Sequence, residues 1–515
     1  MPDESPQTPK RGLWLRFAIA SLTIVLISGA ATATVALNTV GGIAAEVFPA
    51  VSHIDAPKGL VTDEYSGGPQ TFLVLGSDRR AKSKDVYDAS DPPHSDTILL
   101  VRFDPNQGQT SVMSIPRDLK VNITTPSGAV YENEKINAAY TIGAKLGGAK
   151  GATLLAAETI EHEVFPGLHL NGIVDVNFAG FIKVVDTLGC AYVNVDHRYY
   201  NENVGSVETD YTSINLQPGY QKLCYENALD YVRYRHTDSD FVRVARQQDF
   251  LRDLREQVSP ERAIEQIETV AKAVGHAIST TFPASASELI ELTKLVAFSQ
   301  TKPLRQVKFL TTSSGATIGG VSFVTSDHEL EMQTLREFLH GDEKVAVPSS
   351  PAPSSHHTGG SSHHASSSTS AHVAGLFPTS SSGESEALQA AVQVPFRVLY
   401  PSLQTGPAEQ QTVRPYLLWD QQNHPHHAYV VVWRQNSIGG YYDFEGSDWL
   451  NPPLFAHART QVIDGREYRM VDDGSHIHVI GWRSGKVLYW VTNTLLEELS
   501  NAQMIAIAHS AHTLH

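Results

Sequence analysis

The chain has 515 residues, enough for roughly three domains. Hydrophobic residues make up 41% and charged residues 18%, a globular composition that excludes a fully disordered or collagen-like chain. The formal charge of −16 argues against a general nucleic-acid binder, which needs a basic surface to displace the counterions of phosphate. With only two cysteines, the chain cannot contain a cysteine-rich metal module.

An apolar segment near the N-terminus predicts export. Residues 17–37 carry no charge over 21 positions, the length that a helix needs to cross a bilayer core of roughly 30 Å. Basic residues precede this segment and none follows it before Lys58, so the positive-inside rule predicts a single-pass protein of the cell membrane. Residues 1–16 would then be a cytoplasmic tail, and all later domains would be extracellular. A cleaved signal peptide is the alternative, because residues 31–33 have a small-x-small pattern.

Both interpretations export the rest of the chain into a compartment where disulfides persist. Cys190 and Cys224 are the only cysteines and lie in one predicted domain. We therefore predict a disulfide between them, the alternative being two buried free thiols.

Residues 38–66 are expected to form a juxtamembrane linker, followed by an α/β domain over residues 67–342. Helical patterns separate its strands, and Asn177 can cap one such helix that runs to Leu188. This alternation predicts a sheet covered by helices on both sides. Apolar runs typical of strands buried on both faces occur at residues 71–75, 97–103, 112–115 and 173–176.

Residues 343–391 are rich in Ser, His and Pro and predict a flexible linker that cannot bury a core. We interpret its paired histidines as solvated linker residues in preference to an adventitious metal site. Residues 392–515 alternate apolar and polar positions between polar turns, which predicts a β-rich domain closed by a C-terminal helix. No catalytic constellation is visible in this second domain.

Charged residues gather where the predicted strands of the first domain end, the place where α/β sheets bind ligands. Asp78 follows the first strand and Asp96 precedes the second. Two carboxylates, completed by water and phosphate oxygens, are a typical environment for Mg²⁺. The pair therefore predicts a site for Mg²⁺ or Mn²⁺, although each Asp alone is more typical of a turn or cap.

Arginines are concentrated beyond two further elements. Arg117 follows the strand that ends at Ile115, and Asp118 is placed to orient its guanidinium. An extended segment over 231–235 would put Arg233 and Arg235 on one face. A helix beginning near Asp240 would align a second set, and converging guanidinium groups suit a pyrophosphate. The alternative is a solvated basic face paired with Asp238 and Asp240. The second set consists of Arg243, Arg246 and Gln247.

Five segments occur in the order LVLGSDRR, HSDTILLVRFDP, SIPRDLKVNI, EKINAAY and DYVRYRHTDSDFVRVARQQ. Together they resemble the LytR–CpsA–Psr (LCP) family of cell-wall glycopolymer ligases, strongly over residues 70–255 and more weakly to residue 342. The resemblance implies an α/β/α sandwich after one N-terminal transmembrane helix, with a hydrophobic pocket for a polyprenyl chain. It also implies a phosphotransferase that moves a glycopolymer from a polyprenyl-(pyro)phosphate carrier onto a peptidoglycan hydroxyl, forming a phosphodiester.

The resemblance assigns roles to individual residues. Asp78 and Asp96 would hold the metal. The family usually has Arg two residues before the second Asp, where this chain has His94, so Arg79, Arg80 or His94 itself would face the phosphate. The candidates for the general base are Asp118, Asp238 and Asp240. The catalytic assignments are Arg117, Asp118, Arg233 and Arg235. The pyrophosphate-binding assignments are Arg79, Arg80, Arg117, Arg233, Arg235, Arg243, Arg246 and Gln247.

We expect the lipid tail to be buried between the sheet and the helices, against the helix that carries Phe178, Phe181 and Val185. The expected partners are a polyprenyl-linked glycopolymer, peptidoglycan and the membrane, with no nucleic acid. Three other functions stay open: a polyprenyl pyrophosphate hydrolase, a non-catalytic wall-binding scaffold, and a transcriptional attenuator. The acidic charge and the lack of a helix-turn-helix signal speak against the last.

Overall fold

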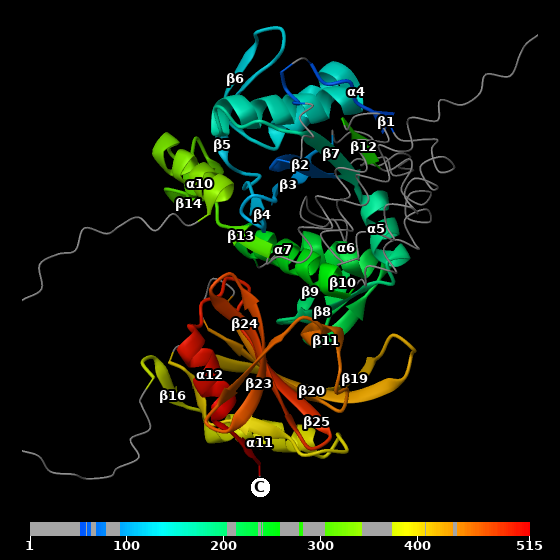
Figure 1. Ribbon diagram of the computed structural model, residues 1–515, viewed down its shortest axis with the longest axis vertical. Coiled ribbons are helices and arrows are strands. Elements are labelled where there is room, and N and C mark those ends of the chain that lie inside the picture. Colours follow the sequence, from blue (N-terminus) through cyan, green and yellow to red (C-terminus); the bar gives the residue numbers. More distant parts are fainter. Residues whose placement is uncertain are drawn as a thin grey trace, which may run out of the picture.

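The computed structural model describes residues 52–57, 59–62, 68–78, 93–202, 213–234, 238, 240–257, 278–281, 304–341, 373–406, 408–435 and 440–514. Two domains lie one above the other in Figure 1, an α/β domain in blue to green and a β-rich domain in yellow to red. The predicted membrane segment, residues 17–37, lies outside the described residues. Within them, no helix has the length and apolar character needed to span a membrane.

A mixed seven-stranded sheet forms the centre of the first domain, with strand order β1-β12-β7-β2-β3-β4-β13. The apolar runs expected from the sequence form its central strands, whose side chains are mostly buried. Ser77, at the end of β2, pairs with Ser95 at the start of β3 and with Asn177 at the end of β7, so these ends share one edge. The strands are β1 (Ser52–His53), β2 (Gln70–Ser77), β3 (Ser95–Asp104), β4 (Gln109–Ser114), β7 (Gly172–Asn177), β12 (Ile278–Thr280) and β13 (Leu304–Val307).

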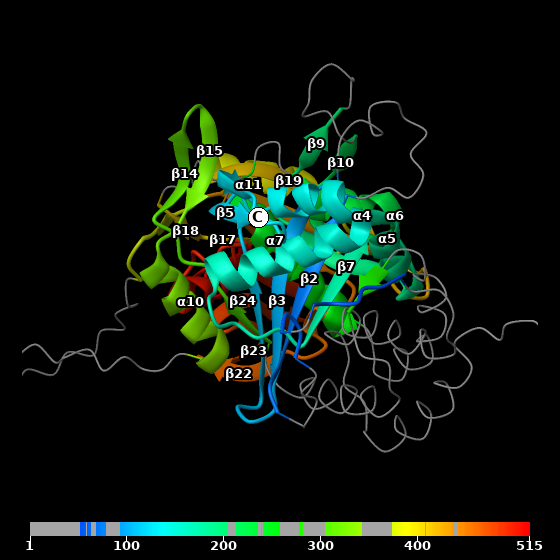
Figure 2. The ribbon, with the colours of Figure 1, turned by 90° about the horizontal axis from the view of Figure 1, so that it is seen from above.

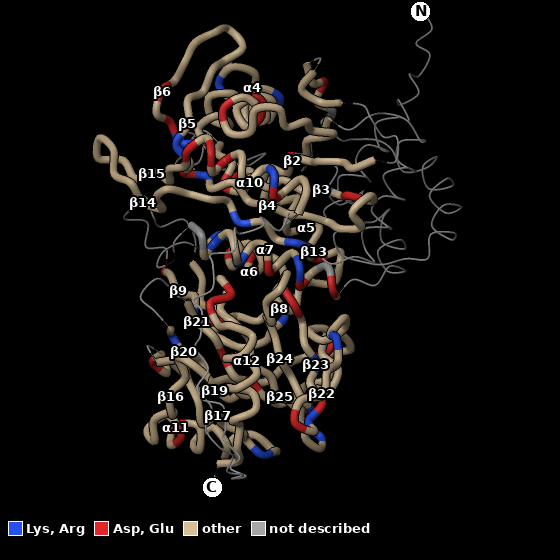
Figure 3. Tube along the Cα trace, turned by 60° about the vertical axis from the view of Figure 1, so that its left-hand side comes forward, with Lys and Arg blue, Asp and Glu red and all other residues tan. Residues whose placement is uncertain are grey.

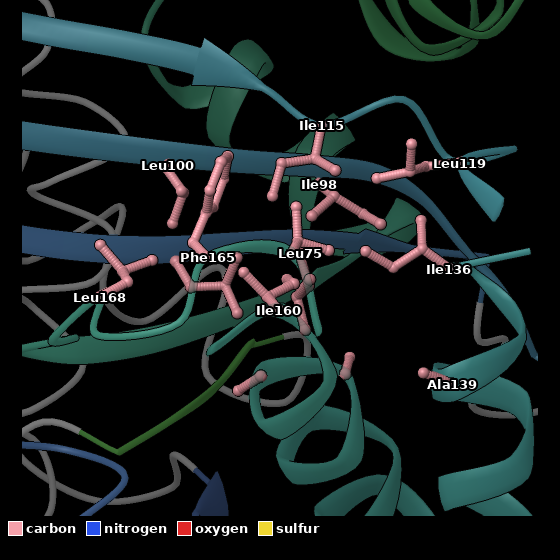
Figure 4. Packing of buried hydrophobic residues seen from close by; sticks show 14 of the residues in the cluster. Leu75, Ile98, Leu100, Ile115, Leu119, Ile136, Ala139, Ile160, Phe165 and Leu168 are labelled. Carbon is pink, nitrogen blue, oxygen red and sulfur yellow. The ribbon is translucent and has the colours of Figure 1, made fainter. Parts of the chain in front are cut away.

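Helices cover both faces of this sheet, as predicted. On one face lies α4 (Ala138–Thr159), which Figure 2 shows crossing above the strands, and it continues into a π-helical turn, η1 (Ile160–Val164). Sheet and helix side chains such as Leu75, Leu100 and Ile160 interlock there in a buried core (Figure 4), to which α10 (His328–His340) also contributes. On the other face lie α5 (Phe178–Thr187), α6 (Tyr225–Arg233) and α7 (Asp240–Gln257).

Two-stranded ribbons project from these layers. The ribbon of β8 (Ala191–Val195) and β11 (Gly219–Leu223) points toward the second domain, and the predicted disulfide Cys190–Cys224 closes its open end. The shorter ribbon of β9 (Tyr199–Asn201) and β10 (Ile214–Leu216) follows it. The other two ribbons are β5 (Lys120–Thr124) with β6 (Val130–Lys135), and β14 (Ser313–Ile318) with β15 (Val321–Thr325).

The second domain is a seven-stranded antiparallel sheet with α11 (Ser381–Ala391) and α12 (Asn501–His509) on its outer face. Its strands alternate, sending one set of side chains toward these helices and the other toward the first domain. In sheet order the strands are β19 (Glu409–Trp419), β20 (Pro425–Arg434), β21 (Tyr441–Ser447), β25 (Val487–Thr492), β24 (His476–Ser484), β23 (Arg466–Asp473) and β22 (Arg459–Ile463). Smaller elements complete it: β16 (Leu376–Pro378), β17 (Leu399–Pro401), β18 (Leu403–Thr405), β26 (Ala511–Thr513) and the 3₁₀ turn η2 (Pro453–Phe455).

The two predicted linkers, residues 38–66 and 343–391, both include residues that are folded. Part of the segment 38–66 is folded, because β1 pairs with β12 and the apolar side chains of Ile54 and Leu60 are buried. The second domain likewise begins by residue 373, since β16 and α11 belong to it. Ala387 and Ala390 of α11 are buried against the sheet, and Ser380 caps the helix by accepting from the Gly383 N–H. The Ser-rich composition had hidden this amphipathic helix.

Candidate active site

The two predicted metal-binding carboxylates meet at the edge of the sheet. Asp78 directly follows β2, and Asp96 is the second residue of β3. The Asp78 N–H donates to the carbonyl of His94 at 3.1 Å, and the His94 N–H donates to Oδ1 of Asp78 at 2.6 Å. Burial raises the pKa of Asp78, and the nearby negative charge of Asp96 raises it further.

Arg117 reaches the same place from the end of β4. Its Nη1 donates to Oδ1 of Asp96 in an ion pair. Burial alone would raise the pKa of Asp96, but the positive charges of Arg117 and then Arg243 outweigh it and hold that pKa below its ordinary value. Asp118 lies behind Arg117, its Oδ1 3.9 Å from the Arg117 Nε and 2.9 Å from Nζ of Lys135. This position agrees with an orienting role and places Asp118 outside the residues that line the cavity described below.

Arg233 comes from a helix, because residues 231–233 belong to α6, so the extended conformation considered for residues 231–235 was wrong at these three positions. Helix α6 continues through Arg233 because it buries Leu229 and Val232 along one face. The Arg233 guanidinium carbon lies 4.0 Å from the ring centroid of Phe178 on α5, a cation–π contact at the edge of the cavity. Arg235 lies outside the described residues, as do Arg79 and Arg80.

Helix α7 begins at Asp240, as predicted, and presents Arg243 and Gln247 to the cavity. The Arg243 Nη2 donates to the main-chain carbonyl of Asp96 at 3.5 Å. The Gln247 Nε2 donates to the carbonyl of Val232 at 3.1 Å, which ties α7 to α6. Figure 3 shows basic and acidic segments together on and beside these two helices.

Arg246 occupies a different environment from its neighbours on α7. Its side chain is 0% exposed and is absent from the cavity lining. Its Nε donates to the Tyr199 hydroxyl at 3.0 Å, its Nη1 donates to the carbonyl of Tyr234 at 2.8 Å, and its Nη2 pairs with Asp238. The Asp238 side chain is therefore buried and paired with Arg246. In this position it is poorly placed to accept a proton from a substrate as a general base. The side chain of Asp240 is not described.

An apolar cavity opens beside these charged groups. The cavity and its mouth together hold about 1270 Å³. The predicted wall helix α5 does line it, with Phe178, Phe181 and Val185, and α7 lines the opposite side with Phe250 and Leu254. The sheet contributes the floor. The polar and charged lining residues include Asp96, Thr97, Asn177, Arg233, Arg243, Gln247, Gln248 and Gln306.

One supporting carboxylate was not recognised in the sequence. Asp175 in β7 is 0% exposed and accepts from the Ser77 hydroxyl at 2.8 Å and from the Tyr140 hydroxyl at 2.7 Å. It thereby fixes the end of β2, next to Asp78, against α4. The signal that could have indicated it is a single acidic residue inside the apolar run 173–176, because a buried carboxylate without partners is costly.

The donor set fits a hard divalent cation such as Mg²⁺, which takes one or two carboxylates and completes its shell with water and phosphate oxygens. Asp78 and Asp96 supply hard oxygen atoms, and the arginines near them suit the charge of phosphate. Among the described residues no group of three or more His, Cys, Asp or Glu forms an all-protein metal site.

The model of the LytR_cpsA_psr family matches residues 49–337. This match covers more than half of the chain, and the chain therefore belongs to the LytR–CpsA–Psr family, as its motifs indicated. The matched region coincides with the α/β domain and ends before the second domain begins.

Several curated proteins are similar to part of this chain. Biofilm regulatory protein A of Streptococcus mutans is 26% identical over 284 residues, which are 54% of this chain and 64% of that protein. Regulatory protein MsrR of Staphylococcus aureus is 27% identical over 220 residues, which are 42% of this chain and 58% of that protein. An uncharacterised S. aureus protein is 29% identical over 211 residues, which are 40% of this chain and 47% of that protein. The matched region is thus about half to two thirds of the length of these relatives.

Solved structures align with about half of the chain. TagV of Bacillus subtilis is 24% identical with a TM-score of 0.40, and the alignment covers 53% of this chain and 98% of TagV. TagT bound to LI-WTA is 21% identical with a TM-score of 0.41, over 56% of this chain and 99% of TagT. Each alignment takes in nearly all of the solved chain and about half of this one.

Proposed function

We propose that this protein is a phosphotransferase that moves a glycopolymer from a polyprenyl-(pyro)phosphate carrier onto a hydroxyl of peptidoglycan. The observation that carries the proposal is the cavity, whose walls are mostly apolar and whose lining also includes Asp96, Arg233 and Arg243. A long isoprenoid gains about 0.8 kcal/mol for each CH₂ that it buries, so the apolar walls suit its tail. The two arginines of the lining suit the pyrophosphate to which that tail is joined.

The charged residues in and beside the cavity provide what phosphoryl transfer needs, which is positioning and neutralisation of charge more than a protein nucleophile. Asp78 and Asp96 would hold Mg²⁺ or Mn²⁺, which would neutralise charge on the phosphate oxygens. Arg233 and Arg243 bind the polyprenyl phosphate as negative charge develops on it during its departure. Arg117 keeps Asp96 ionised and oriented through their ion pair. The roles predicted for Arg79, Arg80 and Arg235 belong to the same proposal.

We also propose that residues 17–37 anchor the protein in the cell membrane and that the domains face outward. The disulfide Cys190–Cys224 supports this orientation, because such bonds persist in oxidising compartments. Protease added to intact cells should digest the β-rich domain while it spares a cytoplasmic marker protein. Digestion that requires broken cells would contradict this orientation.

The reaction is tested by supplying a short lipid-linked glycopolymer with peptidoglycan fragments and a divalent cation, and by identifying the product. We expect a phosphodiester between the two sugars and its loss on addition of a chelator. Asp96→Asn and Arg243→Ala should each lower turnover about 100-fold, in keeping with the removal of one charge-stabilising group. Arg459→Ala, a change at an exposed arginine of the second domain, is the control and should retain full activity.

Other outcomes would reject the proposal in distinguishable ways. Release of free polymer phosphate with no sugar adduct would identify a hydrolase. Binding of both substrates without turnover would identify a wall-binding scaffold. Turnover that a chelator leaves unchanged would remove the metal role of Asp78 and Asp96.

A further inference from the structure

Helix α7 joins the cavity to the second domain. Arg243 and Gln247 on one face line the cavity. About half a turn away around the helix, Arg252 is buried and pairs with Asp249 at 2.8 Å. The Arg252 Nη1 also donates to Oδ2 of Asp473 in β23 at 3.3 Å. The second domain therefore holds the same helix that presents side chains to the cavity.

A second connection runs through the segment between β8 and β9. The imidazole of His197 stacks on the ring of Tyr441 in β21, with centroids 4.1 Å apart and planes at 13°. The adjacent Tyr199 hydroxyl donates to Asp196 at 2.5 Å and accepts from the Arg246 Nε at 3.0 Å. The second domain is thus connected to Arg246 through His197 and Tyr199. Arg246 in turn binds the end of α6 and Asp238.

The contact between the domains includes a buried apolar cluster. Tyr192 and Tyr220 of the β8–β11 ribbon share one hydrophobic cluster with residues of the second domain. The Tyr192 ring lies 5.4 Å from that of Trp449, and the Tyr220 hydroxyl accepts from the Leu454 N–H at 3.0 Å. Asn194 donates to Asp443 at 2.8 Å. Such a core fixes the relative position of the two domains, as the interior of a single domain would.

We propose that the second domain is a positioning domain, which holds α7 and the β8–β9 segment so that Arg243 and Gln247 face the phosphates of the ligand. Asp473 and Tyr441 act through Arg252 and His197 and do not themselves line the cavity. This inference rests on the proposed function for its ligand, a prenyl pyrophosphate. It assigns a role to a domain that lies outside the part of the chain matched by the family.

The test uses the full chain, with farnesyl pyrophosphate and Mg²⁺ as the binding probe and amide hydrogen exchange as the structural measurement. Asp473→Asn and Tyr441→Ala should each weaken probe binding roughly threefold to thirtyfold, the range found for changes that act through a network. Exchange should become faster in residues 240–257 and 196–202. Farnesol, which lacks the phosphates, should bind both variants as it binds the wild type.

Matched controls separate positioning from general damage. Asp472→Asn changes the neighbouring carboxylate of β23, which pairs with Arg459 inside the second domain, and should leave probe binding unchanged. Tyr441→Phe keeps the stacked ring and should restore the wild-type affinity. If Tyr441→Ala does not fold, Asp473→Asn still decides the question.

Wild-type affinity for farnesyl pyrophosphate in both Asp473→Asn and Tyr441→Ala would overturn the inference, whatever their exchange rates. If the wild type binds no probe, that failure lies with the proposed function, and exchange alone decides the inference. In that case faster exchange in α7 supports a positioning domain, and unchanged exchange in α7 overturns it.

Discussion

Arginines that belong to one sequence motif have different tasks in this fold. Arg243 lines the cavity and donates to the Asp96 carbonyl, whereas Arg246, three residues later, is enclosed by Tyr199, Tyr234 and Asp238. Both were assigned to pyrophosphate binding because they share a face of the predicted helix. That assignment remains a prediction for Arg246, but its surroundings indicate a residue that supports the site from behind.

Substitution of these two arginines should therefore have different consequences. Arg246→Ala removes the ion pair with the buried Asp238 and the hydrogen bonds to Tyr199 and Tyr234, so we expect a loss of about 3–5 kcal/mol in the free energy of unfolding. Arg243→Ala should lose much less stability and should weaken binding of farnesyl pyrophosphate. Urea unfolding and ligand titration measure the two effects. Equal stabilities for the two variants would show that Arg246 does not have this structural role.

Glu445, whose carboxyl group is buried between the domains, should make the stability of the folded state depend on pH. Glu445 is fully buried and accepts from the Tyr416 hydroxyl and, at 3.2 Å, from the Tyr220 N–H. Burial raises the pKa of Glu445 to about 7, and burial likewise raises the pKa of Asp443 on the same face of β21. A group with a raised pKa in the folded state stabilises that state while it is protonated. Its contribution is complete below about pH 4.5 and is lost as the pH rises through about 7.

We therefore expect the wild type to lose thermal stability between about pH 5 and about pH 8, and Glu445→Gln to lose less over the same interval. Melting curves at a series of pH values provide the measurement. Glu409→Gln is the control, since Glu409 is exposed and pairs with Arg434 at the surface. Parallel pH profiles for wild type and Glu445→Gln would refute the role of this carboxyl.

At the scale of single elements, the sequence predicted well wherever hydrophobic periodicity was strong. The buried strands, the helix capped by Asn177 and the helix that starts at Asp240 are all present. The prediction failed at residues 231–233, because a short Tyr- and Arg-rich segment satisfies an extended and a helical pattern equally well. The helix is favoured because it buries Leu229 and Val232 against the cavity. Such tertiary contacts are not visible in the local sequence.

Helix α5 offers a direct test of the cavity. Val185→Trp should fill part of the space and weaken binding of farnesyl pyrophosphate at least about tenfold, since several CH₂ groups lose their place. Lys183→Trp adds the same side chain to the exposed face of the same helix and should bind normally. Binding to Val185→Trp with wild-type affinity would mean that the lipid tail lies elsewhere.

At the scale of the whole molecule, the two domains form one body. The hydrophobic cluster around Tyr192, Tyr220 and Trp449 and the buried pair between Arg252 and Asp473 join them. The sequence indicated two domains and a segment between them, but it contained no signal for their contact. Aromatic residues such as Tyr192 satisfy the strand pattern whether their partners belong to the same domain or to another.

We expect the domains to remain together when the chain between them is cut. A protease site introduced between residues 342 and 373 should, after cleavage, give two fragments that elute as one complex in gel filtration. Association through a buried apolar core accounts for this result. Elution as two separate fragments would show that the covalent connection, and not the interface, keeps the domains in contact.

The shared cluster also limits how this architecture can be exchanged between proteins. Tyr192 and Tyr220 belong to the α/β domain by chain position, yet they complete the apolar face of the β-rich sheet. A recombination event that moved residues 373–515 onto another member of the family would leave that face without its cover. A transferred segment therefore has to bring the ribbon of β8 and β11, closed by the disulfide Cys190–Cys224, with it. We expect chimaeras made with this ribbon to be soluble and those made without it to aggregate.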